Sequence, residues 1–479
     1  MDNVKNPAFV ILGGRDASSS IPALMDDETT MTFQQLRALS FSYAQHFVAS
    51  GVGPASLIAL SSADPAVVVA STLASGLLGC RMIFPSPDTL TRLLPEISHC
   101  FETKDAPLFG EDLFALIDET WSVPPKGAPT AQIEDFPGCA SPQDEWLIFG
   151  TSGTTGRKKF VPLTFQALHR RSEVEAALLP ESQTRMVCLF GITSAAFMQR
   201  VFSAFYMSGT IVRSADPVFW QKAHVTRVFA SPAQIRTALT SAESDRLMPQ
   251  VCIGGGGISD NLAEQLFDRF NAVDSLYGAT ETGPILRTVL SRNGDKIVRT
   301  QHRLETEIQI VDEADNPLPA GQPGQIRMRN DRLGQRYLSD PGQTAATFRH
   351  GYFYPADYGC LTHQGDVELT GRAADQFNLQ GIKIDAAALD DAIIAVDGVR
   401  DAITFLVPRA DGEHRLTAML QIDKNTIFQD IVSNIRIRLM QLGGGALVPE
   451  KFFQTGKMPR TANGKPDRVA CLEKVPDRT

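Results

Sequence analysis

The chain has 479 residues, enough for two or more domains with substantial hydrophobic cores. Apolar residues make up 43% of the sequence and charged residues 21%, as is typical of a soluble globular protein. The net charge of −9 argues against a nucleic-acid-binding protein, in which a basic surface is expected.

The cysteines and the apolar segments favour a cytoplasmic protein without a membrane span. The 7 cysteines are scattered, with no C-x-x-C pair and no Cys/His cluster of zinc-like spacing, so we expect reduced and mostly buried thiols. The first residues lack the apolar core of a secretory signal. The most apolar stretch, 66–79, follows Pro65 and is too short to cross a bilayer, so it predicts a buried core helix.

The N-terminal segments predict alternating helices and strands. Thr32 precedes an apolar pattern of helical period that ends near Gly51. Strands are predicted at 57–60 and 82–84, on either side of the helix that Pro65 opens. This alternation is typical of α/β layers.

A predicted strand at 146–149 leads into a loop rich in glycine and hydroxyl groups. Residues 151–156 read Thr-Ser-Gly-Thr-Thr-Gly, and Lys158 and Lys159 follow. Glycines let backbone N–H groups approach an anion closely, while hydroxyls and lysines add donors and positive charge. We therefore predict a loop that grips a polyphosphate. It differs from a Walker A loop, in which lysine and then Ser or Thr follow the last glycine, and this difference disfavours a P-loop kinase.

Two later segments are candidates for direct contact with a ligand. A mainly apolar helix is predicted at 194–208, and Arg200 interrupts its apolar pattern. One interpretation is a surface-facing arginine that buries only its stem. The other is a counter-charge for a second acidic or polar group on a substrate. Four glycines at 254–257 end another predicted strand and leave backbone exposed for a flat ligand, although glycine-rich turns between strand and helix are common.

The chain resembles the adenylate-forming superfamily, which includes acyl-CoA synthetases, adenylation domains of peptide synthetases and luciferases. The 151–156 string with Lys159 is similar to the phosphate loop of that superfamily. Further blocks that match the family follow in its order: Tyr277-Gly-Ala-Thr-Glu281, Asp357, Gly371-Arg372, and Pro459-Arg-Thr-Ala-Asn-Gly-Lys465. The resemblance therefore covers essentially the whole chain.

The resemblance implies an α/β fold in two domains. A large N-terminal domain of layered sheets and helices, residues 1–373, would bind ATP and the acid, and a small mobile α+β lid domain would follow at 374–479. In the family the lid rotates between two half-reactions and exchanges the face that carries Lys465 for the face that carries the Gly381 turn. The chain departs from the family pattern at Pro355 and Ala356, where Thr-Gly is usual, and at the hinge position Ala374.

In the family the substrate carboxylate attacks the α-phosphorus of ATP, giving an acyl-adenylate and pyrophosphate, and a pantetheine thiol then displaces AMP. Carried over by position, the catalytic residues are Lys465, Thr280 and Glu281, and Glu281 is also the Mg²⁺ ligand. The expected ATP-binding residues are Thr151, Ser152, Gly153, Thr154, Thr155, Gly156, Lys159, Gly255, Gly256, Tyr277, Gly278, Asp357 and Arg372. The expected acyl-pocket residues are Ser194, Phe197, Arg200 and Gly254.

The implied function is an ATP- and Mg²⁺-dependent ligase for a carboxylic acid, with CoA favoured as the thiol acceptor. A stand-alone adenylation enzyme that loads the phosphopantetheine of a carrier protein is the alternative, and a non-catalytic nucleotide-binding homologue is a further one. Family members that activate α-amino acids hold the ammonium with an aspartate near the start of the 194–208 helix. This chain has no acid between Leu189 and Met207, so we expect an acid other than an α-amino acid.

Overall fold

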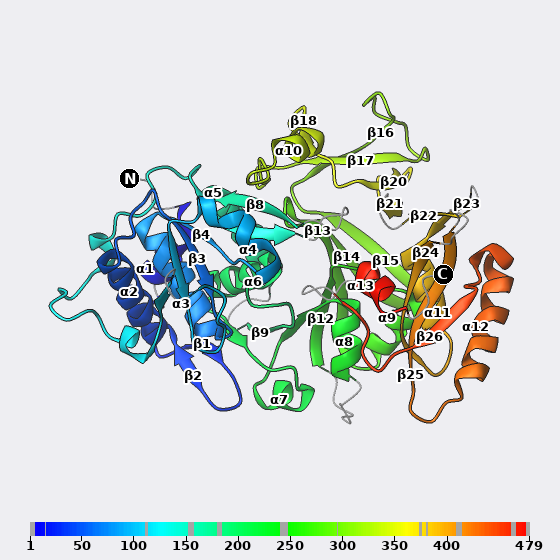
Figure 1. Ribbon diagram of the computed structural model, residues 1–479, viewed down its shortest axis with the longest axis horizontal. Helices are drawn as coiled ribbons and strands as arrows, with labels where there is room; N and C mark the ends of the chain where they lie inside the picture. Colours follow the sequence, from blue (N-terminus) through cyan, green and yellow to red (C-terminus); the bar gives the residue numbers. More distant parts are fainter. Residues whose placement is uncertain are drawn as a thin grey trace.

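The computed structural model describes residues 5–14, 16–110, 114–151, 158–179, 184–239, 248–294, 296–372, 376–379, 382–408, 414–460 and 466–475. Mixed α/β layers confirm the predicted fold class (Figure 1). Two sheets with their helices come first along the chain, a third sheet follows, and an α+β unit ends it.

The first sheet has strand order β6-β5-β3-β4-β7-β8 and is parallel except for the β7–β8 pair. Its strands are β3 (Leu57–Ser61), β4 (Arg81–Ile83), β5 (His99–Glu102), β6 (Ala115–Leu116), β7 (Glu145–Thr151) and β8 (Lys159–Thr164). The helices of this part are α1 (Pro7–Gly13), α2 (Phe33–Ala49), α3 (Pro65–Leu78), α4 (Pro87–Leu93) and α5 (Phe165–Ala176).

Side-chain caps fix where the first long helices begin. Thr32 and Gln35 form a capping box at the start of α2, and the Asp64 carboxylate accepts from the N–H of Ala66 at the start of α3. Nearly every residue of α3 is buried, which confirms the core helix predicted at 66–79. Among the residues that the structure describes, every helix is too short or too polar to traverse a lipid bilayer.

The second sheet has strand order β15-β14-β13-β12-β11-β9-β10-β1-β2. Its strands are β1 (Pro22–Met25), β2 (Thr30–Thr32), β9 (Arg185–Cys188), β10 (Thr210–Val212), β11 (Arg227–Ala230), β12 (Met248–Gly254), β13 (Phe270–Ala279), β14 (Gly283–Asn293) and β15 (Lys296–Arg303). The helices that connect them are α6 (Ala195–Tyr206), α7 (Pro217–Lys222), α8 (Pro232–Leu239) and α9 (Asp260–Phe267). The parallel strands β11, β12 and β13 end next to one another, which gathers their following loops at one edge.

One aromatic stack joins the first sheet to the helices beside it. The Trp146 indole of β7 lies parallel to the rings of Phe165 in α5, at 4.9 Å, and Phe202 in α6, at 5.4 Å. Its N–H donates a 2.9 Å hydrogen bond to Ser75 Oγ of α3. The strand that leads into the predicted phosphate loop is therefore anchored in the core.

A third sheet and a C-terminal unit complete the chain. The sheet consists of β16 (Glu307–Val311), β17 (Gly324–Arg329), β18 (Phe348–Arg349), β19 (Tyr352–Phe353), β20 (Asp357–Leu361) and β21 (Val367–Arg372), with α10 (Pro341–Thr347) beside it. The hairpin β22 (Gln376–Leu379) and β23 (Ile382–Asp385) follows. The C-terminal unit contains α11 (Ala386–Ile394), β24 (Val399–Pro408), β25 (His414–Ile422), α12 (Phe428–Gly443), β26 (Lys451–Gln454) and α13 (Arg468–Glu473). It has hydrophobic clusters of its own, so it is a small α+β unit, as expected.

Candidate active site

The two strands that flank the predicted phosphate loop pair with each other. Thr151, the last residue of β7, lies opposite Lys159, the first residue of β8. The loop residues Ser152, Gly153, Thr154, Thr155 and Gly156 lie outside the described residues. The residues on either side of the predicted loop are therefore neighbours in the first sheet.

The two lysines after the loop have different surroundings. Lys158 donates a 2.9 Å hydrogen bond to Ser86 and forms a 3.2 Å ion pair with Asp88, so α4 and its cap hold it. Lys159 instead places its ammonium 4.9 Å from the centre of the Tyr337 ring, a cation–π contact. Lys159, the lysine that matches the family position, is thus the one that lies beside the 277–281 turn described next.

Glu281 is buried and is held by a tyrosine that the sequence analysis did not select. The Tyr337 hydroxyl donates a 2.8 Å hydrogen bond to Glu281 Oε1, and the carboxylate residue is only 7% exposed. Burial and the neighbouring Glu281 raise the pKa of Tyr337, so its hydroxyl keeps its proton. Three different parts of the chain therefore supply one group of contacting side chains. They are β8 with Lys159, the segment before α10 with Tyr337, and the turn between β13 and β14 with Glu281.

The backbone of the same turn is fixed by Arg171 of α5. Its guanidinium donates 2.9 Å hydrogen bonds to the carbonyl oxygens of Thr280 and Glu281, and a 2.7 Å bond to the carbonyl of Arg332. Burial and the neighbouring Arg332 lower the pKa of Arg171 to about 9, so it stays cationic at neutral pH. Gly283 has φ +67°, and a Cβ there would lie 3.1 Å from the Arg171 side chain. Arg171 thus sets the direction of the half-buried Thr280 and of Glu281.

Tyr277 and Asp357 meet although they lie far apart in the sequence. The Tyr277 hydroxyl donates to the Asp357 carboxylate, and Asp357 is 6% exposed. Asp357 begins β20 and lies opposite Arg372, the last residue of β21. The preceding residue, Ala356, has φ +62°, the left-handed region that glycine favours. The family glycine that this chain lacks is therefore replaced by an alanine that keeps a glycine-like backbone.

Three of the four glycines predicted to leave backbone exposed, Gly255, Gly256 and Gly257, are exposed after β12, whereas Gly254, the last residue of β12, is buried. A Cβ at Gly254 would lie 2.8 Å from the Phe229 ring, and one at Gly256 would lie 3.0 Å from Pro232. Gly255 has φ +76°, and Gly255 and Gly256 are exposed. Gly278 has a similar constraint, because a Cβ there would lie 2.2 Å from the Gly283 carbonyl oxygen. Residues with side chains would not fit at Gly254 or Gly278 without movement of their neighbours.

The predicted acyl-pocket residues of α6 separate in the structure. Ser194 caps the helix by accepting from the N–H of Phe197, and Phe197 is buried in the N-terminal core. Arg200 is 4% exposed and forms an ion pair with Glu175 of α5, which is 3% exposed. The interpretation of Arg200 as a surface-facing arginine is therefore wrong: the sequence gives no sign of the buried partner that neutralises it.

The C-terminal motifs are only partly described. Strand pairing places the backbone of Arg372 opposite that of Asp357. Lys465, Ala374 and Gly381 lie outside the described residues. An antiparallel bridge joins Arg460 and Pro466 on either side of the segment that contains Lys465, and Arg460 is held by an ion pair with Asp401.

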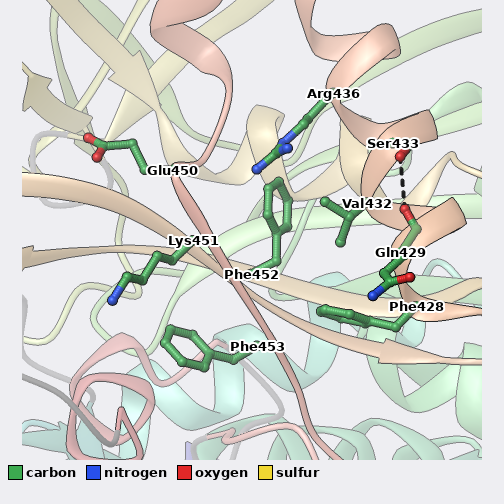
Figure 2. A pocket seen from close by; sticks show the side chains of 9 residues that line it. All are labelled: Phe428, Gln429, Val432, Ser433, Arg436, Glu450, Lys451, Phe452 and Phe453. Carbon is green, nitrogen blue, oxygen red and sulfur yellow. Dashed lines mark hydrogen bonds between the residues drawn. The ribbon is translucent and has the colours of Figure 1, made fainter.

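A pocket of about 420 Å³ lies in the C-terminal unit, between α12 and β26 (Figure 2). Phe428 and Val432 from α12 and Phe452 and Phe453 from β26 line it, and the Arg436 guanidinium lies 5.5 Å from the Phe452 ring. The predicted site residues lie on other elements, so this pocket is separate from the group around Glu281.

The main protein ligand of a metal ion at this site would be Glu281. Within the described parts of the chain, no group of three or more His, Cys, Asp or Glu residues is arranged to hold a metal. Mg²⁺ commonly takes one or two carboxylates and completes its shell with phosphate oxygens and water. One buried carboxylate oriented by Tyr337 and lying beside a predicted phosphate loop fits that pattern.

Comparison with known proteins identifies the family. The model of the AMP-binding enzyme family matches residues 16–338. This chain belongs to the AMP-binding enzyme family. Its relatives include acyl-CoA synthetases and peptide-synthetase adenylation domains, which confirms the resemblance to the adenylate-forming superfamily.

The relatives of this AMP-binding enzyme are distant. Tyrocidine synthase 3 from Brevibacillus parabrevis is 24% identical over 495 residues, covering 95% of this chain and 7% of that protein. Feruloyl-CoA synthase from Amycolatopsis sp is 24% identical over 468 residues, covering 91% of this chain and 92% of that protein. The chain thus spans only a small part of the synthase and nearly all of the CoA ligase.

Solved structures share the fold. An anthranilate CoA ligase in complex with anthranoyl-AMP matches with a TM-score of 0.81 at 15% identity, covering 98% of this chain and 96% of the other. A four-domain nonribosomal peptide synthetase bound to AMP and glycine matches with a TM-score of 0.80 at 19% identity, covering 97% of this chain and 36% of the other. Both likenesses concern the fold, which includes a large N-terminal domain and a C-terminal lid.

Proposed function

We propose that this protein uses ATP to convert a carboxylic acid into an acyl-adenylate with release of pyrophosphate, and then transfers the acyl group to a pantetheine thiol. The main observation behind the proposal is that the segment 277–281 takes part in two sets of side-chain contacts. Tyr277 holds Asp357 on one side, and Glu281 is held by Tyr337 next to Lys159 on the other. The first group suits a nucleoside and the second suits a phosphate chain.

Each residue has a role that its surroundings support. Asp357 accepts hydrogen bonds from ribose hydroxyls, which a buried carboxylate held by a tyrosine is oriented to do. The flat backbone of Gly255 and Gly256 and the Tyr277 ring border the adenine. Lys159 and the 151–156 loop hold the β- and γ-phosphates, and the Thr280 hydroxyl reaches the α-phosphate. Arg171 keeps Thr280 and Glu281 in position, so the donors are in place before charge develops.

Two positively charged groups, Mg²⁺ and Lys465, would balance the negative charge that builds up on the phosphates. Mg²⁺ bound at Glu281 would neutralise the phosphate oxygens of ATP. Lys465, in the segment between Arg460 and Pro466, would contact the carboxylate and the α-phosphate from the C-terminal side. A general base is unnecessary because the substrate carboxylate is already ionised at neutral pH.

The proposal includes a division at residue 373, with 1–373 binding ATP and the acid and 374–479 acting as a mobile lid. The C-terminal unit has its own hydrophobic clusters, which supports its movement as one body. Rotation of that body would replace Lys465 by the Gly381 turn and admit the thiol.

CoA is the favoured acceptor. The likeness to feruloyl-CoA synthase extends over 92% of that enzyme, whereas tyrocidine synthase 3 is matched over 7% of its length. A phosphopantetheine carrier protein is the second candidate, supported by the peptide synthases among the relatives.

Acid-dependent exchange of pyrophosphate into ATP tests the first half-reaction. The assay would use aryl, fatty, dicarboxylic and amino acids, with Lys465→Ala as the inactive control. Exchange with one acid class that is lost in Lys465→Ala is the expected result, and addition of CoA or a carrier protein then identifies the acceptor. ATP binding without exchange for any acid would contradict adenylation and would favour a non-catalytic nucleotide-binding protein.

A further inference from the structure

The short helix α4 holds the end of the predicted phosphate loop at two points. Ser86 and Asp88, at the start of the helix, bind the side chain of Lys158. Arg92, in the last turn of the helix, donates a 2.6 Å hydrogen bond from Nη2 to the carbonyl oxygen of Lys158. That carbonyl belongs to the planar peptide group between Lys158 and Lys159, so Arg92 fixes the backbone directly before Lys159.

Arg92 also contacts the residue that follows Lys159. Its guanidinium carbon lies 5.2 Å from the centre of the Phe160 ring, a cation–π contact. Successive side chains of a strand point to opposite faces of the sheet. Phe160 therefore meets Arg92 on one face of β8, and Lys159 is directed to the other face, where its ammonium meets the Tyr337 ring. One guanidinium thus contacts both chain neighbours of Lys159.

The segment that carries Tyr337 is held against the same part of β8. The N–H of Leu338 donates a 2.8 Å hydrogen bond to the carbonyl oxygen of Phe160. Leu93, the last residue of α4, belongs to the same buried apolar cluster as Phe160 and Leu338. The relative position of Lys159 and Tyr337 therefore depends on α4, an element that contains none of the predicted site residues.

Fixing the backbone at Lys159 has a consequence for nucleotide binding. A lysine side chain is a flexible four-carbon stem, so ordering its ammonium against a phosphate costs conformational entropy. A backbone that already directs the stem toward the site reduces that cost. In the proposed site Lys159 binds the β- and γ-phosphates, which ATP carries and AMP lacks. Loss of the Arg92 contacts should therefore weaken binding of ATP and leave binding of AMP unchanged.

We propose that Arg92 is a positioning residue for recognition of the ATP phosphates, and that it acts through Lys159 rather than by contact with the nucleotide. The inference rests on the proposed adenylation function and adds a residue of α4 to those that the sequence motifs supply. Arg92 binds the carbonyl of Lys158 and not its side chain. This role is therefore independent of the ion pair between Lys158 and Asp88.

Binding of ATP and of AMP to the full-length protein, measured by titration calorimetry with Mg²⁺ present, tests this role. Arg92→Met keeps an unbranched stem beside Phe160 and removes the donor to Lys158. It should raise the Kd of ATP by about three- to tenfold, the range for loss of one hydrogen bond, and change the Kd of AMP by less than about twofold. Arg92→Lys keeps a cationic donor and should recover part of the ATP affinity; it also serves as the test variant if Arg92→Met does not fold.

A double-mutant cycle shows whether Arg92 acts through Lys159. Lys159→Ala removes the ammonium that Arg92 would position, so Arg92→Met added to Lys159→Ala should raise the Kd of ATP by less than about a further twofold. Arg185→Met is the matched control, because Arg185 also donates a hydrogen bond, of 2.7 Å, to a backbone carbonyl, that of Ala223 after α7. It should lower the unfolding temperature about as much as Arg92→Met does, and it should leave the Kd of ATP unchanged.

The binding measurements separate failure of this inference from failure of the proposed function. An unchanged Kd of ATP in Arg92→Met, equal weakening of ATP and AMP, or additive effects in the cycle would overturn the role of Arg92. The expected pattern of Kd values in a protein that exchanges pyrophosphate with no acid would support that role and contradict only the adenylation reaction. A native protein that binds neither nucleotide would overturn both.

Discussion

The hydroxyl of Tyr337 donates a 2.8 Å hydrogen bond to the carboxylate of Glu281. The two residues lie on different parts of the chain, and both are buried. A buried carboxylate needs hydrogen-bond donors to compensate for its removal from water, and a carboxylate oxygen is the kind of ligand that Mg²⁺ prefers. Tyr337 therefore positions the proposed metal ligand and keeps it ready for binding.

Removal of this hydroxyl should weaken the response to magnesium. Tyr337→Phe keeps the ring beneath Lys159 but removes the donor to Glu281. We expect the Mg²⁺ concentration for half-maximal pyrophosphate exchange to rise by about tenfold, as for loss of one hydrogen bond to a charged group. Tyr352→Phe is the matched control, because Tyr352 donates a 2.6 Å hydrogen bond to Glu307 on the third sheet. An equal effect of the two substitutions would argue against a role for Tyr337 in metal binding.

The left-handed backbone at Ala356 should make a glycine there favourable. Alanine at φ +62° is strained by contact of its Cβ with the backbone, so Ala356→Gly should raise the free energy of unfolding by about 1 kcal/mol. Ala345 is exposed within α10, and Ala345→Gly should lower the same free energy by about 1 kcal/mol. Thermal or urea unfolding of the two variants measures the contrast. Destabilisation by both would show that Ala356 is unstrained.

Residues of the proposed site differ in how far the sequence could predict them. Tyr277, Glu281 and Asp357 belong to short sequence motifs that occur in the same order as in the family. They could therefore be selected from the sequence alone. The bond that joins Tyr277 to Asp357 spans 80 positions, and only the folded chain brings the two β-segments together. The layered α/β fold could be predicted because buried runs and capped helices alternate along the sequence.

Arg171, Glu175 and Tyr337 were missed for a common physical reason. Arg171 and Glu175 belong to α5, whose polar residues resemble a solvent-facing surface in the sequence. In the structure α5 packs against α6 and contacts the loop before β14, so both residues are buried. A charged side chain that is buried by two elements distant in sequence leaves no periodic signal. Tyr337 likewise acts through a contact with a residue 56 positions away.

The stability of the C-terminal unit should increase as the pH falls below about 6. Asp390 of α11 accepts a 2.6 Å hydrogen bond from the N–H of Thr404 and pairs with Arg468 at 3.0 Å. Burial raises the pKa of Asp390 from 3.8 to about 6, against the opposing effect of Arg468. The folded state therefore binds the proton of Asp390 more tightly than the unfolded state does. Above pH 6 the buried, ionised Asp390 lowers the free energy of unfolding by its full amount, and this destabilisation disappears as the pH falls from 6 to 3.8.

The difference of about two pKa units between folded and unfolded Asp390 corresponds to roughly 3 kcal/mol in the free energy of unfolding. Hydrogen-exchange protection of α11 and β24 amides, corrected for intrinsic rates, should therefore rise between pH 7 and pH 4.5, and Asp390→Asn should lack this rise. Asp423→Asn removes an exposed partner of Arg400 and should leave it intact. Protection that falls over this pH range would reverse the sign of the pKa shift.

The two lysines after the phosphate loop offer the most direct comparison in the site. Lys158 is held by Ser86 and Asp88, whereas Lys159 lies over Tyr337 beside Glu281. If Lys159 binds the phosphates of ATP, Lys159→Ala should raise the KM for ATP in pyrophosphate exchange by about tenfold to a hundredfold. Lys158→Ala removes the same charge one residue away and should change that KM by less than about twofold, because an exposed ion pair contributes little. Equal losses would indicate that only the total charge near the loop matters, and a larger loss for Lys158→Ala would assign the phosphate contact to Lys158.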